Sequence, residues 1–152
     1  MNGLARPPRA EALAAFAKTY AWTSVLFAVL FGVFEQLFGW GLGLLGALVP
    51  ALIASNRAAE VFARRRKRAP EREEAWRMAI EMGVMAAAVG LLLVAGLVVP
   101  LVLLSGRAGE VAAGLATLAP GTLTASAVLG AAIVAVAMRL VWPWQVRQAL
   151  GK

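Results

Sequence analysis

Four charged residues lie close to the ends of long apolar stretches and are the first candidates for chemistry: Arg57, Glu60, Glu81 and Arg139. Charged side chains are costly within a membrane, and those that occur there commonly mark a functional site. The four residues would lie at one depth near the same side, where two acids and two bases can neutralise one another. We therefore predict a cluster of ion pairs at the rim of the membrane that joins three helices.

The residue types that are missing exclude most kinds of catalysis. The chain has no Cys, no His and no Asp, which removes thiolate nucleophiles, the commonest general base and the usual zinc ligands. Serine–lysine chemistry would need Lys18, and no serine is placed to pair with it. Glu35 stands near the opposite end of its stretch, and no acidic group near mid-membrane continues an ion path from it. We predict a protein that is not an enzyme and has no cofactor or metal.

Composition indicates the elements that must position these residues. Of the 152 residues 61% are hydrophobic and only 15% are charged, with a mean hydropathy of +0.77. A membrane helix needs about 20 mainly apolar residues, and four stretches meet that length: about 19–38, 41–62, 78–104 and 123–142. We predict an all-α fold in which residues 1–152 form a single four-span antiparallel transmembrane bundle, with a basic loop at 63–77.

The basic residues predict the orientation of this bundle. All of the 15 Lys and Arg residues except Arg107 fall on one side of a four-span arrangement. Basic residues favour the cytoplasmic side of a membrane. We therefore expect both termini and the central loop to be cytoplasmic.

A run of five consecutive basic residues occupies the central loop: Arg64, Arg65, Arg66, Lys67 and Arg68. Such a run attracts anionic lipid head groups at about 1 kcal/mol per residue. A nucleic-acid site would need interleaved aromatic residues or a recognisable module, and the sequence has neither. We expect contact with anionic lipid and no nucleic-acid partner, and an acidic protein partner is the alternative.

Small residues recur at every fourth position through the second stretch. They are Gly39, Gly43, Ala47, Ala51, Ser55 and Ala59. Residues four apart share a helix face, so this pattern predicts a shallow groove that lets another helix approach closely. Phe27, Phe31, Phe34 and Phe38 form a matching ridge on the first stretch. We expect the ridge to lie in the groove, and the alternative is that another helix or another protomer fills it.

The basic loop also carries a resemblance to a known family. The segment from Asn56 to Phe62, the basic run with Pro70, Glu73, and Arg77-Met78-Ala79 resemble the corresponding loop of a family of uncharacterised four-helix bacterial inner-membrane proteins. The resemblance implies four spans in a bacterial inner membrane and assigns no activity or site. Small multidrug transporters are similar in size, but they need a glutamate deep in the first helix, where residues 25–33 carry no charge.

Two functions remain open at this point. We favour an accessory, assembly or interaction subunit that binds another membrane protein or a second copy of itself. The alternative is a small oligomeric transporter or channel subunit, which would need a polar lining. The stretches offer few polar side chains for that purpose: Thr23, Ser24, Ser55, Asn56, Thr124 and Ser126.

Overall fold

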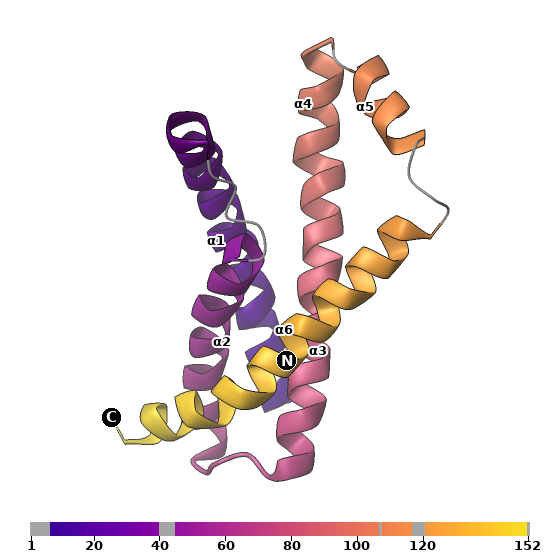
Figure 1. Ribbon diagram of the computed structural model, residues 1–152. Coiled ribbons are helices and arrows are strands. Elements are labelled where there is room, and N and C mark those ends of the chain that lie inside the picture. Colours follow the sequence, from indigo (N-terminus) through magenta and orange to yellow (C-terminus); the bar gives the residue numbers. More distant parts are fainter. Residues whose placement is uncertain (1–6, 40–44, 107, 117–120, 152) are drawn as a thin grey trace, which may run out of the picture.

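The computed structural model describes residues 7–39, 45–106, 108–116 and 121–151, and this part of the chain is helical without strands. The helices are α1 (Pro8–Phe38), α2 (Leu45–Arg66), α3 (Arg72–Leu93), α4 (Val99–Leu104), α5 (Ala108–Ala116) and α6 (Thr122–Leu150), with a π-helical turn, η1, at Val94–Val98. Figure 1 shows α3, η1 and α4 as one continuous rod, beside which α1 and α2 form a hairpin. The long helix α6 crosses in front of them.

Local sequence explains where the first helices begin and end. Pro8 occupies the first turn of α1, where its missing N–H group costs nothing. Gly39 ends α1 in the left-handed conformation, with φ of 69°, and its N–H group donates to the carbonyl of Glu35. Glu71 precedes α3, and Glu73 and Glu74 lie in its first turn, where acidic side chains favour the positive end of the helix dipole.

The π-helical turn coincides with a proline. Pro100 has no N–H group, and in a regular α-helix its ring would clash with the carbonyl of Gly96. The helix instead contains one wider, π-helical turn, in which the N–H group of Val99 donates to the carbonyl of Val94, five residues earlier. The rod continues through Pro100 without a break in its helical path.

Three helical segments are long and apolar enough to cross a membrane: Pro8–Glu35, Arg72–Leu104 and Thr124–Leu150. The chain therefore has the character of a membrane protein. The described part of α2 is not apolar enough over this length. Three segments therefore qualify, instead of the four that we expected. The reason is that α2 carries Asn56, Arg57, Glu60 and a terminal Arg64-Arg65-Arg66. Residues 40–44, which complete the second expected stretch, lie outside the described part.

One end of the bundle carries the start of α1, the α2–α3 loop and the end of α6, and we call it the basic end. The packed core lies at this end. Here α1, α2, α3 and α6 all contribute fully buried side chains, the largest of which are Phe16, Phe62, Met78, Met138 and Trp142. Phe62 and Trp142 meet edge to face, with ring centroids 5.1 Å apart. Toward the other end, the open end, the α1–α2 hairpin and the rod diverge (Figure 1). The bundle is thus tightly packed at one end alone.

Candidate functional site

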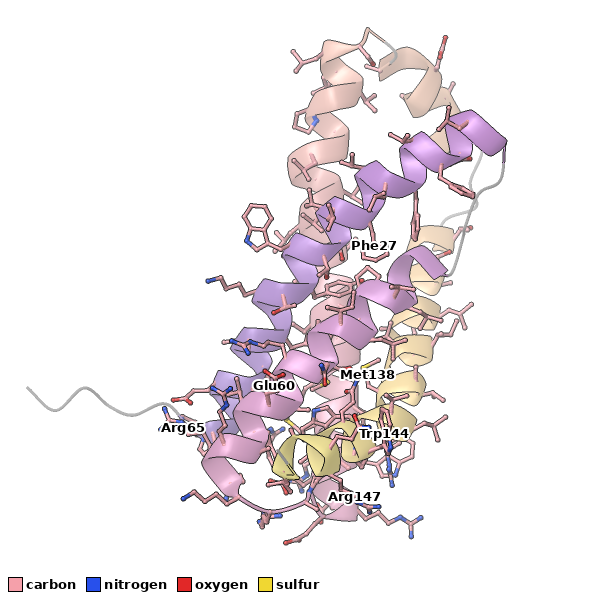
Figure 2. The ribbon with its side chains drawn as sticks, turned by 90° about the vertical axis from the view of Figure 1, so that its left-hand side faces the viewer. Phe27, Glu60, Arg65, Met138, Trp144 and Arg147 are labelled. Carbon is pink, nitrogen blue, oxygen red and sulfur yellow. The ribbon has the colours of Figure 1, made fainter. Side chains whose placement is uncertain are left out.

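Ion pairs at the basic end connect the N-terminus of α1 to two other helices. The Nε of Arg9 donates a 2.7 Å hydrogen bond to Glu81 on α3. Arg65, near the end of α2, donates two hydrogen bonds of 2.8 and 3.0 Å to the carboxylate of Glu11. Figure 2 shows Arg65 and Arg147 at this end and Phe27 nearer the other. These contacts hold the start of α1 between α2 and α3.

The four charged residues of the predicted rim cluster do not come together. Arg57 pairs with Glu60, three residues along the same helix, at 2.6 Å. Glu81 pairs with Arg9 rather than with Arg57 or Arg139. The guanidinium of Arg139 lies over the ring of Trp76, 5.3 Å from its centroid. The prediction of one cluster is wrong because it assumed a common depth, whereas Arg9, which lies outside the predicted spans, reaches Glu81 first.

The basic run divides into paired and unpaired residues. Arg65 pairs with Glu11, and Arg68 pairs with Glu71 and Glu74. In the described ranges, seven basic residues have no acidic partner: Lys18, Arg64, Arg66, Lys67, Arg72, Arg139 and Arg147. Exposed pairs contribute less than about 1 kcal/mol each, so the excess positive charge at this end is the more prominent property.

The predicted small-residue groove contacts α6 at its centre. Ala51, Ser55 and Ala59 are fully buried. The hydroxyl of Ser55 donates a 2.8 Å hydrogen bond to Oε1 of Gln145 on α6. Nε2 of Gln145 donates a 3.3 Å hydrogen bond to the carbonyl of Leu52. At Ser55 the groove thus meets α6 of the same chain. Gln145, a buried polar residue, was not foreseen as a site residue.

The remaining members of the groove lie elsewhere. Gly39 ends α1 and is not part of α2, Gly43 lies outside the described residues, and Ala47 is within α2 although its side chain is not described. The phenylalanine ridge meets α2 at Gly46, where an added Cβ would lie 3.3 Å from Cδ2 of Phe31. Phe27 and Phe31 contact each other edge to face at 5.2 Å. The ridge therefore meets α2 at Gly46, next to Ala47 of the stripe.

An apolar crevice separates α1 from the rod toward the open end. It has a volume of about 580 Å³ and is lined by Tyr20, Ser24, Val25, Ala28, Gly46, Gly90 and Val94, among others. A smaller cavity of about 220 Å³ between α3 and α6 shares Tyr20, Gly90 and Val94 with it. Tyr20 stacks in parallel on Phe16, with ring centroids 5.7 Å apart. Tyr20 and Ser24 are the polar side chains of the crevice, which otherwise presents hydrocarbon and backbone.

Among the residues that the structure describes, no three His, Cys, Asp or Glu side chains are grouped so that they could hold a metal ion. Comparison with known proteins adds no assignment, because no family model, no curated protein and no solved structure matches the chain.

Proposed function

We propose that this chain is a non-enzymatic integral membrane protein that serves as an accessory, assembly or interaction subunit of a membrane complex. The observation that carries the proposal is the apolar crevice between α1 and the rod, which ends at Tyr20. A surface of this kind suits an apolar transmembrane segment of another membrane protein or of a second copy. Such segments associate through close packing against small residues.

Glycines in the wall of the crevice support this role. An added Cβ at Gly90 would meet nothing within 4 Å, so the backbone of α3 is accessible there from the crevice. Close backbone approach is the usual basis of helix association in a membrane, because apolar side chains gain little when they exchange contacts with lipid for contacts with another helix. The wall also argues against the alternative of a transporter, because Tyr20 and Ser24 are its polar side chains and neither is an acid.

The proposed setting is the bacterial inner membrane, with four antiparallel spans and both termini in the cytoplasm. Support comes from the excess of basic residues at one end and from the resemblance of the basic loop. Although α2 has weak hydropathy, its polar Ser55 is buried against α6. Shelter by neighbouring helices offers a physical reason why α2 can be the fourth span.

Site-specific photo-crosslinking in cells tests the proposal. A photoreactive phenylalanine analogue at Val94, in the crevice, should give a discrete protein adduct whose partner is identified by mass spectrometry. Val128 is the matched control, because it is an exposed valine on α6 that lines none of the described cavities. The adduct at Val94 should disappear when Gly90→Leu fills the crevice and persist when Gly32→Leu adds the same side chain in open space on α1.

The opposing outcome is equally definite. An equal pattern of adducts at Val94 and Val128, or an adduct that survives Gly90→Leu, would contradict a partner site in the crevice. The purified protein should also be silent when it is reconstituted alone in liposomes with entrapped ion-sensitive dyes. Robust flux that Glu35→Gln or Glu81→Gln abolishes would favour the transporter instead.

A further inference from the structure

A second, narrower groove runs along the outer side of the contact between α1 and the rod. It has a volume of about 340 Å³ and its lining includes Trp22, Val25, Leu92 and Gly96. Gly96 belongs to the π-helical turn, and an added Cβ there would meet nothing within 4 Å. We call this feature the lateral groove. Apart from the indole N–H of Trp22, whose side chain is 71% exposed, the groove presents apolar groups.

An unpaired cation lies at the basic end of the lateral groove. Lys18 precedes Trp22 by four residues, so the two side chains share one face of α1. The pair Arg9–Glu81 spans 72 residues and sets the register between α1 and α3, which run in the same direction. The cavity linings place Tyr20 near Ala86 and Gly90, and Trp22 near Leu92 and Gly96. Lys18 is therefore level with the apolar length of the rod, well beyond the ion pairs of the basic end.

Among the described residues, no acid pairs with this lysine. Glu11 pairs with Arg65, Glu60 on α2 pairs with Arg57, and Glu81 pairs with Arg9. Glu35 is 17 residues further along α1, which is about 25 Å at the helical rise. The neighbouring large side chains of the rod, Leu91 and Leu92, are exposed hydrocarbon. An anion from outside the chain could therefore neutralise this ammonium group.

We propose that the lateral groove binds one phospholipid with an anionic head group. The phosphate accepts hydrogen bonds from the ammonium of Lys18 and the indole N–H of Trp22, and one acyl chain lies along Val25, Leu92 and Gly96. The groove has a positive charge at one end and hydrocarbon along the rest, which matches the anionic head group and the acyl chain of such a lipid. The lateral groove shares Val25 with the crevice, but Trp22, Leu92 and Gly96 line the groove and not the crevice, so the proposal does not depend on a protein partner.

Native mass spectrometry of the purified full-length chain tests the lipid site. The protein is delipidated in detergent and titrated with either phosphatidylglycerol or phosphatidylcholine, and the bound lipids are counted per protomer. The wild type should retain one phosphatidylglycerol in preference to phosphatidylcholine. Lys18→Gln should weaken the retention of phosphatidylglycerol about fivefold, the usual effect of one basic residue near a lipid head group. Arg147→Gln, which removes a basic residue without an acidic partner from α6, should leave it unchanged.

A second pair of variants tests the acyl-chain part of the site. Gly96→Leu should displace the lipid, whereas Gly32→Leu, which also adds a side chain in open space, should not. Thermal unfolding of each variant shows whether the fold is retained, and Lys18→Gln decides the matter if Gly96→Leu does not fold. Equal retention of both lipids by the wild type, or unchanged preference in Lys18→Gln, would overturn the proposal. A failure of this kind leaves the crosslinking result at Val94 unaffected, so the two proposals fail separately.

Discussion

Ser55 on α2 and Gln145 on α6 are joined by a buried hydrogen bond of 2.8 Å between residues 90 positions apart. The two partners are not equivalent, because the Ser55 hydroxyl also lies 2.9 Å from the carbonyl of Leu52 in its own helix. Loss of Gln145 therefore leaves Ser55 with an acceptor, whereas loss of Ser55 leaves Oε1 of Gln145 buried without a donor.

This asymmetry gives the first prediction. Ser55→Ala should lower the free energy of unfolding by about 1 kcal/mol, the usual cost of a buried polar atom left unsatisfied in a membrane protein. Gln145→Leu should cost less, and the double variant should recover part of the loss caused by Ser55→Ala. Thermal unfolding of the three variants in one detergent measures the effect. A double variant whose loss equals the sum of the single losses would mean that the two side chains do not interact.

The close approach of α3 and α6 gives the second prediction. A Cβ added at Gly83 would lie 2.5 Å from the carbonyl oxygen of Ala131 and 3.0 Å from Cβ of Ala135. Gly83→Ala must therefore push the two backbones apart, and we expect a loss of about 1–3 kcal/mol in the free energy of unfolding. Gly130→Ala on the facing helix meets open space and should be neutral or slightly stabilising. Equal unfolding temperatures for the two variants would contradict this packing.

Much of this architecture could be predicted from sequence because it depends on local patterns. Length and hydropathy located three apolar segments close to their observed positions, and Gly39 ends a helix as glycine commonly does. Ala51, Ser55 and Ala59 of the small-residue stripe are buried. Periodicity along one helix indicates such a face, but it does not identify the helix that covers it, and at Ser55 that helix is α6.

The ion pairs could not be predicted for a related reason. The partner of Glu81 depends on the register between α1 and α3, which is determined by packing over their whole length. Lys18 illustrates the same point, since sequence position alone places it at the beginning of an apolar stretch. The packing of α1 against α3, which brings Tyr20 to Ala86 and Gly90, places it level with the apolar part of α3.

The third prediction concerns that register. A double-mutant cycle of Arg9→Gln and Glu81→Gln should give a coupling energy of about 0.5–1 kcal/mol, because both side chains are partly exposed. The coupling should fall as salt is added, since the pair is accessible to screening ions. The same cycle with Arg57→Gln in place of Arg9→Gln should give no coupling, because Arg57 pairs with Glu60. Chemical unfolding in detergent at two salt concentrations measures all of these values, and coupling of Glu81 to Arg57 instead would show that the register is different.

The last prediction addresses orientation in the membrane. The chain has no cysteine, so single substitutions can be labelled in whole cells with a thiol reagent that does not cross the membrane. Ala69→Cys lies in the exposed loop between α2 and α3, and Ser105→Cys lies at the exposed end of α4. Basic residues surround Ala69, and basic loops remain in the cytoplasm. We expect labelling at position 105 alone in intact cells and at both positions after the cells are opened. The opposite pattern, with labelling at position 69 alone in intact cells, would reverse the orientation and place the basic end outside.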